Sequence, residues 1–216
     1  MADVGTDHGL LPRCLLLEGR VPLAYALDLR EGPLSAAARG AAADGLGERE
    51  GFLARRSDGL AALQPGQAQT ATLAGLGGGL IAAILGRAGG HVRGAGGLRR
   101  IVASPNREPE RVRRWAMEAG WDLIHEALVA DRGHFYPVLT LEPRAPGAPA
   151  PTWSEADLRL GPLLRAARPP AYLAWIAAER QRIGRAIDAA TPRASRQALD
   201  ALRIEAEDLE AELARR

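Results

Sequence analysis

The first stretch with chemical potential is a turn rich in carboxylates and glycines, Asp3-Val4-Gly5-Thr6-Asp7-His8-Gly9. Glycines let a backbone approach a ligand closely, but this spacing is not the Gly-x-Gly-x-x-Gly arrangement that binds dinucleotide phosphates. An acidic residue two positions before the first glycine favours a cationic ligand instead, because carboxylates attract positive charge and repel phosphates. The pattern is typical of sites for S-adenosylmethionine, which carries an ammonium and a sulfonium group. An ordinary Asp/Gly turn is the alternative interpretation.

Two more acidic residues follow predicted strands. Asp28 ends the second strand, where an acid can accept hydrogen bonds from both hydroxyls of a ribose. Asp58, followed by Gly59, comes after the third strand, where it or its neighbours could hold an adenine amino group. Each acid alone is more often a cap or turn residue. Three acids at three successive strand ends predict one shared rim, because ligands bind at the carboxyl ends of strands in parallel sheets.

A glycine-rich run, Gly75-Leu76-Gly77-Gly78-Gly79, follows the fourth predicted strand. A phosphate loop for the cofactor would belong to the first strand, so this run fits a backbone-lined slot for a planar base better. A flexible turn into a helix is the alternative. After the fifth strand, Ser104-Pro105-Asn106 adds a carboxamide that can donate to and accept from an adenine edge.

These motifs require strands and helices that bring them to one edge. Short apolar runs alternate with helical patterns over the first two thirds of the chain, which implies a parallel sheet covered on both faces, in the α/β class. The expected strands are residues 2–4, 22–29, 51–56, 70–74 and 100–104, and the expected helices are residues 10–18, 33–43 and 108–119. Two extended runs, 121–130 and 134–141, flank Asp131-Arg132-Gly133. That spacing predicts a β-hairpin, so that one antiparallel strand closes an otherwise parallel sheet.

The last third of the chain has a different pattern. Residues 143–152 are a proline-rich linker by composition, which separates a domain at 1–142 from a helical domain at 153–216. Two sets of apolar positions in the helical domain follow the 3,4 spacing of a coiled-coil seam. They are Leu173, Ile176, Ile183 and Ile187, interrupted by Arg180, and Leu199, Leu202, Ala206, Leu209 and Leu213. Thr191-Pro192 between them predicts a helix start, so the two helices should fold back antiparallel.

This helical pair is either a self-sufficient hairpin or dimerisation device, or an arm that holds a large substrate. The sequence leaves the oligomeric state open. The first helix and turn carry Arg180, Arg182, Arg185, Arg193 and Arg196, whereas the second helix carries Glu205, Glu207, Asp208, Glu210 and Glu212. If this helical pair binds RNA, the binding face must therefore lie on the first helix and the turn and exclude the acidic second helix.

Composition narrows the class of protein. The chain has 216 residues with a net charge of +2, and 47% of them are hydrophobic, which argues against global disorder. Cys14 is the only cysteine, no apolar run reaches the roughly 20 residues that span a bilayer, and the N-terminus lacks a signal-peptide pattern. We therefore expect a cytoplasmic protein without disulfides or membrane segments. Every one of the 28 residues counted as Lys or Arg is an arginine, and this abundance alone is weak evidence for nucleic-acid binding.

The histidines suggest no metal site. His8, His91, His125 and His134 lack metal-ligand spacing, and no cysteine cluster accompanies them. The sequence also lacks a Gly-x-Ser-x-Gly elbow and a P-loop. We therefore predict no metal cofactor.

Taken in order, the motifs resemble those of the bacterial tRNA (adenine-22-N1)-methyltransferase family, TrmK type. The matching stretches are residues 2–12, 28–34, 57–60, 74–78 and 104–106, with His134-Phe135-Tyr136 and Leu160-Gly161-Pro162-Leu163 further on. The pair Gly-Thr-Asp-His and Ala-Gly-Leu-Gly-Gly is the most specific part. The chain departs from the family pattern at Leu76 and Ser104, where Met and Gln are more frequent, and its first domain is short at the N-terminus.

The resemblance implies a Rossmann-like class I methyltransferase domain followed by a C-terminal coiled-coil domain. It implies an enzyme that transfers a methyl group from S-adenosylmethionine to N1 of an adenine in tRNA. By that resemblance Asp3, Gly5, Asp28 and Asp58 fall on cofactor-binding positions, and Asp7 falls on the family's candidate for catalysis. We add Leu29, Gly59, Ala74 and Gly75 to the cofactor site and Asn106 to the catalytic pair. The expected tRNA contacts are His8, Gly77, Gly78, Pro105, Arg107, Arg111 and Arg114, with Arg113 beside them.

Two other functions remain compatible with these residues. One is a methyltransferase that uses S-adenosylmethionine on a small molecule or a protein. The other is a non-catalytic RNA-binding or coiled-coil interaction module. Binding of S-adenosylmethionine separates the module from the enzymes, and methylation of tRNA separates the two enzymes.

Overall fold

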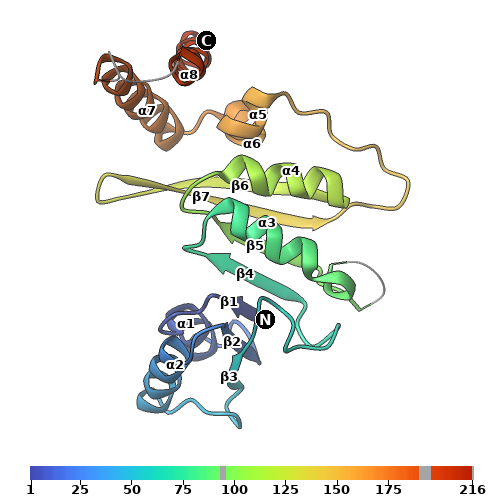
Figure 1. Ribbon diagram of the computed structural model, residues 1–216. Coiled ribbons are helices and arrows are strands. Elements are labelled where there is room, and N and C mark those ends of the chain that lie inside the picture. The colour runs from blue at the N-terminus through green and yellow to red at the C-terminus, as the bar shows by residue number, and fades with distance from the viewer. Residues whose placement is uncertain (93–95, 190–195, 216) are drawn as a thin grey trace. The chain divides into compact units, whose positions relative to one another are not determined.

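The computed structural model describes residues 1–92, 96–189 and 196–215 (Figure 1). Seven of its strands form a mixed sheet in the order β3-β2-β1-β4-β5-β7-β6. They are β1 (Ala2–Val4), β2 (Ala24–Asp28), β3 (Phe52–Arg56), β4 (Thr70–Ala74), β5 (Arg100–Ser104), β6 (Trp121–Asp131) and β7 (His134–Pro143). The predicted α/β class is confirmed, and each of these strands overlaps its predicted range.

The ladders between the first five strands are parallel. β1 pairs with both β2 and β4, β2 pairs with β3, and β4 pairs with β5. β7 runs antiparallel to β5, which confirms that the hairpin adds an antiparallel strand. The expectation that this strand closes the sheet is wrong, because β7 lies between β5 and β6. β7 carries the fully buried Leu139 and Leu141, whereas β6 exposes Ile124 and Val129, so the apolar content favours β7 for the inner position.

The strand order reverses between β1 and β4. Right-handed crossovers then place the helices after β1 and β2 on one face of the sheet and the helices after β4 and β5 on the other. The loops after β1 and β4 diverge at this point, and ligands of open α/β sheets bind in the crevice formed there. The topology therefore brings residues 5–9 and 75–79, far apart in sequence, to the same place.

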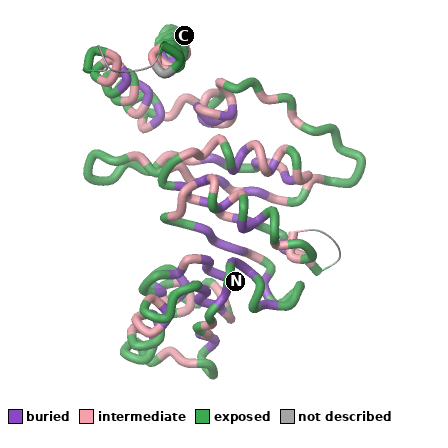
Figure 2. Tube along the Cα trace, in the orientation of Figure 1, coloured by how far each residue is buried: buried purple, intermediate pink, exposed green. Residues whose placement is uncertain are grey.

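The helices that accompany the sheet are α1 (Leu10–Leu17), α2 (Glu31–Ala43), α3 (Gly78–Arg87), the short 3-10 helix η1 (Gly89–His91) and α4 (Pro109–Ala119). α2 packs Ala37 and Ala41 against Ala26 of β2 and Phe52 of β3. Buried positions recur along the inner sides of these helices and along the strands (Figure 2). The core thus lies on the sheet, and the carboxyl ends of the strands remain open to loops.

α4 is fixed to the sheet by a buried ion pair. Arg113 on this helix is 1% exposed, and its Nε donates to Glu126 Oε1 of β6 at 2.7 Å. Each charge satisfies the other, since an isolated buried charge would be strongly unfavourable. The placement of Arg113 among the tRNA-binding arginines is therefore wrong, because its guanidinium faces the protein interior.

The chain forms two compact units, residues 1–127 with 137–152 and residues 128–136 with 153–216. The second unit contains α5 (Glu155–Leu160), α6 (Pro162–Ala167), α7 (Pro170–Ala189) and α8 (Arg196–Ala214). α5 begins with a capping box, in which Ser154 Oγ accepts from the N–H of Asp157 and the Asp157 carboxylate accepts from the N–H of Ser154.

No helix in the described part of the chain is long and apolar enough to cross a membrane.

α7 and α8 pack against each other in opposite directions. Arg182 interacts with Glu205, whereas Tyr172, ten residues earlier on α7, interacts with Glu212 near the end of α8. The core of this unit consists of Leu160, Leu164, Tyr172, Ile176, Ile183 and Leu209, with Leu128 of the hairpin packed on it. The antiparallel arrangement is confirmed, while the predicted helix start at Thr191-Pro192 lies outside the described residues.

The predicted seam is wrong at its first and last positions. Leu173 is 37% exposed and Leu213 is 38% exposed, and the neighbouring Tyr172 and Glu212 are buried in their places. The larger ring of Tyr172 also contacts Trp175, with 5.8 Å between ring centroids. Arg180, which interrupts the apolar positions of α7, stays on the surface. It forms an ion pair with Glu210 of α8 beside the apolar contact between the two helices.

Candidate functional site

The carboxylate of Asp3 lies buried within β1, one residue before the end of the strand. Asp3 is 6% exposed; Thr6 Oγ1 donates to its Oδ2 at 2.7 Å, and Thr72 Oγ1 of β4 donates to its Oδ1. Burial raises the pKa of Asp3, and the two hydroxyl hydrogen bonds act against that rise. Within the described residues this carboxylate has no cationic partner, so it remains an attractor for a positively charged ligand.

Asp28 ends β2 and is also buried. Its Oδ1 accepts a hydrogen bond from the backbone N–H of Arg30 at 2.8 Å, and Arg30 Nε lies 3.7 Å from the same oxygen. Its Oδ2 makes no hydrogen bond to any described residue. Leu29, the next residue, exposes its side chain to solvent. An acceptor beside an exposed apolar side chain suits a ribose with an attached base.

Asp58 lies two residues beyond β3 and is exposed. Its Oδ1 is 3.3 Å from Arg87 Nη2 of α3, and both side chains are largely exposed, so this ion pair contributes little to stability. The following residue, Gly59, is buried, and a Cβ atom there would lie 2.7 Å from Ile84 Cγ2. Sequence reasoning missed the arginine partner, because Arg87 lies on an element that comes much later in the chain.

Asp7 and His8 are exposed in the turn after β1. His8 Nε2 lies 3.9 Å from Asp7 Oδ1. The backbone N–H groups of Gly5 and Thr6 both donate to the carbonyl of Leu27, at 2.8 and 3.0 Å, which anchors the turn to β2. The anchored turn therefore presents Asp7 as an accessible carboxylate.

Asn106 is tied to the glycine-rich run. Its backbone N–H donates to the carbonyl of Leu76 at 2.9 Å, and its Nδ2 donates to the carbonyl of Gly75 at 3.1 Å. Its Oδ1 is left without a hydrogen bond in the part of the chain that is described. Ala74 and Gly75 are exposed, Pro105 is buried, and a Cβ atom on Gly75 would meet no atom within 4 Å. The result is an open stretch of backbone with a carboxamide oxygen beside it.

The side chain of Leu76 connects this loop to the turn after β1. Gly5 has a φ of +74°, and a Cβ atom on it would lie 3.2 Å from Leu76 Cδ2. Only glycine adopts this backbone without strain and leaves room for the leucine. Leu76 thus contacts the carboxylate turn with its side chain and Asn106 with its carbonyl, a role that sequence reasoning did not assign.

Thr6 and Thr72 were also missed as site residues. Thr72 is the partner of Asp3 across the β1–β4 ladder. The sequence would point to Thr72 only if the strand order were known. Thr6 lies inside the first motif and could have been identified as a local donor to Asp3.

Arg107 and Glu108 close the other side of the glycine-rich run. Gly77 pairs with Arg107 in a parallel bridge, and the N–H of Gly78 donates to the carbonyl of Arg107 at 2.9 Å. A Cβ atom on Gly78 would lie 2.0 Å from the carbonyl oxygen of Glu108. A Cβ atom on Gly77 would lie 3.1 Å from Arg107 Nε, so the Arg107 side chain lies across the run.

The remaining predicted contacts lie on α4. Arg111 and Arg114 line a groove of about 430 Å³ between α3 and α4, and Arg111 Nε donates to Glu108 Oε1 at 2.9 Å.

Over residues 1–92, 96–189 and 196–215, no group of three or more His, Cys, Asp or Glu side chains is placed to hold a metal ion.

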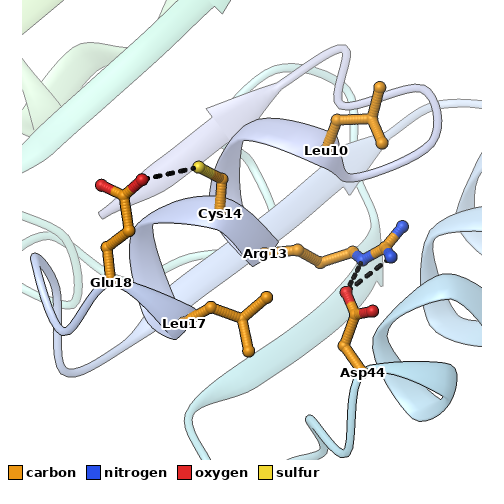
Figure 3. Close-up of a pocket in the computed structure, with 6 residues that line it drawn as sticks. All are labelled: Leu10, Arg13, Cys14, Leu17, Glu18 and Asp44. Carbon is orange, nitrogen blue, oxygen red and sulfur yellow. Dashed lines mark hydrogen bonds and ion pairs between the residues drawn. The ribbon is translucent and has the colours of Figure 1, made fainter.

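A second hollow, of about 310 Å³, lies on α1 and contains none of the predicted site residues (Figure 3). Arg13 and Asp44, which both line it, form an ion pair in which Arg13 Nε donates to Asp44 Oδ2 at 2.7 Å, and Cys14 Sγ donates to Glu18 Oε1 at 3.4 Å. The hydrogen bond to Glu18 and its negative charge raise the pKa of the Cys14 thiol. A raised thiol pKa disfavours the thiolate, so Cys14 is not an activated nucleophile.

Sequence comparison relates the chain to proteins of known family. The family profile described as tRNA (adenine(22)-N(1))-methyltransferase matches residues 1–210. The tRNA (adenine(22)-N(1))-methyltransferase of Bacillus subtilis (strain 168) is 33% identical over 147 residues, which make up 66% of this chain and 58% of that protein. The match thus spans less than two thirds of that relative's length.

Solved structures agree with the family match. Streptococcus pneumoniae Sp1610 in complex with S-adenosyl-L-methionine is 27% identical with a TM-score of 0.84, over 98% of this chain and 91% of that one. The M1A22 tRNA methyltransferase TrmK of B. subtilis is 28% identical with a TM-score of 0.82, over 99% of this chain and 91% of that one. With its Rossmann-like α/β sheet and a profile match over nearly its full length, the chain belongs to the tRNA (adenine(22)-N(1))-methyltransferase family.

Proposed function

We propose that this chain is a methyltransferase that uses S-adenosylmethionine to methylate N1 of adenine 22 in tRNA. The observation that carries the proposal is the set of acids on three adjacent parallel strands: Asp3 lies one residue before the end of β1, Asp28 ends β2 and Asp58 lies two residues beyond β3. Parallel neighbours end at the same edge of a sheet, and that edge is where such folds bind ligands. Family membership supports the substrate class.

The residues at this edge fit S-adenosylmethionine. Asp28 offers Oδ2 to the ribose hydroxyls, with Leu29 beside it for the adenine face. Asp3 places a buried negative charge beneath the turn after β1, on the side where the ammonium and sulfonium groups belong. Open backbone at Gly75 leaves room for a ligand to lie against the loop. When bound, the cofactor supplies a methyl group on a positively charged sulfur.

We assign Asp7 and Asn106 to the target adenine. Methylation forms the bond from N1 to carbon as the bond from sulfur to carbon breaks, so the positive charge passes into the adenine ring. The exposed Asp7 carboxylate accepts a hydrogen bond from the N6 amino group and stabilises that charge. Asn106 Oδ1 holds the base edge. Alignment is the other contribution of the protein, and it is worth about 7–11 kcal/mol in well-oriented systems.

Phosphates of the tRNA are bound by arginines. Arg107 lies across the glycine-rich run beside the base slot, and Arg111 and Arg114 extend the positive charge along α4. We propose that α7 and α8 form a coiled-coil hairpin whose α7 arginines give a second contact with tRNA. Phosphate contacts make binding strongly salt-dependent. A tRNA substrate also implies that the protein acts in the cytoplasm.

The test is methylation of an unmodified tRNA transcript that carries adenine at position 22. After incubation with S-adenosylmethionine, nuclease digestion and nucleoside mass spectrometry should detect 1-methyladenosine. A transcript with guanine at position 22 is the control and should give none. Calorimetry should show binding of S-adenosylmethionine. Cofactor binding without tRNA methylation would indicate another substrate, and loss of both would indicate a non-catalytic module.

A further inference from the structure

The groove between α3 and α4 lies outside the methyl-transfer site described above. Gly79 and Ala82 of α3 form its small-residue side, and Arg111, Arg114 and Trp115 of α4 line the other. Its volume of about 430 Å³ is within the range of small-molecule sites. Both helices belong to the same compact unit.

We propose that this groove binds a ribonucleotide of the tRNA strand next to the target adenine. The inference rests on the proposed function, because it adds a subsite to the same substrate. It assigns roles to Trp115 and to the α3 wall, which the methyl-transfer site does not use.

The groove adjoins the base slot along the chain, because Gly79, which lines the groove, directly follows Gly77 and Gly78. The loop from Asn106 to Glu108 leads directly into α4, and the N–H of Gly78 at the start of α3 donates to the carbonyl of Arg107. A Cβ atom on Gly79 would lie 3.3 Å from Arg111 Cδ, so the Arg111 side chain crosses the first turn of α3. Asn106 and the first residues that line the groove therefore belong to two loops that are hydrogen-bonded to each other.

Trp115 supplies a flat apolar surface in the groove. Its ring packs on Trp121 with 6.1 Å between centroids, and Trp121 is fully buried, which holds the Trp115 ring in place. A base can stack on such a supported ring whatever its identity, and this is how proteins bind single strands without reading their sequence.

The charges of the groove favour a nucleotide over a bare anion. Arg111 and Arg114 suit a phosphate, and the exposed pair between Arg111 and Glu108 is weak enough for a phosphate to replace Glu108. Glu110 and Glu118 also line the groove and would repel a free phosphate. The same carboxylates can accept hydrogen bonds from a ribose 2′-hydroxyl or from base amino groups.

The experiment measures the binding of the unmodified tRNA transcript over a range of salt concentrations, in the presence of S-adenosylmethionine. Trp115→Leu should raise the Kd for tRNA about tenfold through lost stacking. Arg114→Gln should reduce the slope of log affinity against log salt by about one. The matched control is Arg39→Gln, an exposed arginine on α2, which should leave both quantities unchanged. The Kd for S-adenosylmethionine should stay at the wild-type value in all three variants.

Because Trp115→Leu could weaken tRNA binding by disturbing the fold, a second variant tests the groove without removing a packed side chain. Ala82→Glu adds a carboxylate to the α3 side without removing a packed side chain, and it should also weaken tRNA binding. If Trp115→Leu, Arg114→Gln and Ala82→Glu all bind tRNA like the wild type while the wild type methylates tRNA, the groove inference is overturned and the proposed function stands. If the wild type neither binds nor methylates tRNA, the proposed function itself fails.

Discussion

Thr72 on β4 donates a hydrogen bond to the buried carboxylate of Asp3 on β1, and the two residues are partners across the parallel ladder. Thr6 donates to the other oxygen of the same carboxylate at 2.7 Å. The Asp3 carboxylate, whose pKa is raised by burial, is thus hydrogen-bonded by neutral hydroxyls from two separate segments. A buried charge without a counterion destabilises the ligand-free protein, and a bound cationic ligand can offset that effect.

Asp3→Asn should change how stability depends on pH. With its pKa raised on folding, Asp3 binds its proton more tightly in the folded state than in the unfolded state. The stability of the wild type therefore falls as the pH rises from the ordinary aspartate pKa to the raised folded one, and then levels off. The Asn variant should lack this fall. Thermal denaturation of the ligand-free proteins across acidic pH measures the difference.

The same substitution should weaken the binding of S-adenosylmethionine by about ten- to a hundredfold, through the loss of a charged interaction. Titration calorimetry checks this effect, with Asp200→Asn on the exposed side of α8 as the control. Unchanged affinity in Asp3→Asn would restrict Asp3 to a role in folding.

Asp7→Asn should separate catalysis from cofactor binding. Asp7 has a φ of 50°, a left-handed conformation that Asn tolerates well, so this variant keeps the turn. We expect a loss of roughly 10²–10³-fold in the single-turnover rate, because the stabilising charge is removed. The Kd for S-adenosylmethionine should stay the same. Equal losses in rate and affinity would make Asp7 a ligand-binding residue only.

Asp7→Ala should be as inactive as Asp7→Asn and less stable, by about 1 kcal/mol of added backbone strain. Chemical denaturation of both variants measures that difference. It shows why alanine alone is a poorer test at this position.

Two glycines of α3 should respond to alanine in opposite ways. In Gly78→Ala the new Cβ would lie 2.0 Å from the carbonyl oxygen of Glu108, so the loops after β4 and β5 must separate. We expect a loss of about 1–3 kcal/mol in unfolding free energy, together with reduced methyl transfer. In Gly86→Ala the Cβ meets no atom within 4 Å, and the helix should gain about 0.5–1 kcal/mol. Urea denaturation of the two variants compares them; similar losses in both would contradict the predicted clash.

Glu212→Gln should destabilise the helical unit. The buried Glu212 carboxylate accepts hydrogen bonds from Arg165 Nε at 3.0 Å and Arg168 Nη1 at 2.8 Å, and Arg215 lies at 3.0 Å. Burial alone would raise the pKa of Glu212, but the hydrogen bonds and charges of the arginines outweigh it and lower the pKa. The ionised group therefore stabilises the fold above the ordinary glutamate pKa, and this contribution is lost as the pH falls through the lowered folded pKa.

At neutral pH the Gln variant should lose about 1–3 kcal/mol of unfolding free energy, because a neutral amide is a weaker hydrogen-bond acceptor for the arginines than a carboxylate. Far-UV circular dichroism during thermal denaturation, at neutral and at acidic pH, measures this loss. Glu207→Gln on the exposed side of α8 is the matched control. A loss in Glu212→Gln that does not shrink at low pH would contradict the ionic explanation.

Much of the molecule was predictable from local patterns in the chain. Strands such as Thr70–Ala74 and Arg100–Ser104 lie where the apolar runs placed them, because backbone periodicity and turn residues act over a few positions. Asp3, Asp28 and Asp58 were predictable for the same reason, since a residue at or just beyond the carboxyl end of a parallel strand lies at a known edge of the sheet. The family could be inferred from the order and spacing of short motifs.

Contacts across elements were not predictable in this way. Thr72 reaches Asp3 only because β4 neighbours β1, and Leu76 packs on Gly5 only because the two loops meet where the strand order reverses. Arg113 looks like any other arginine of its helix until Glu126 of β6 is placed beside it in the core. Such pairings depend on register and packing between distant segments, and these emerge only once the whole sheet and its helices have assembled.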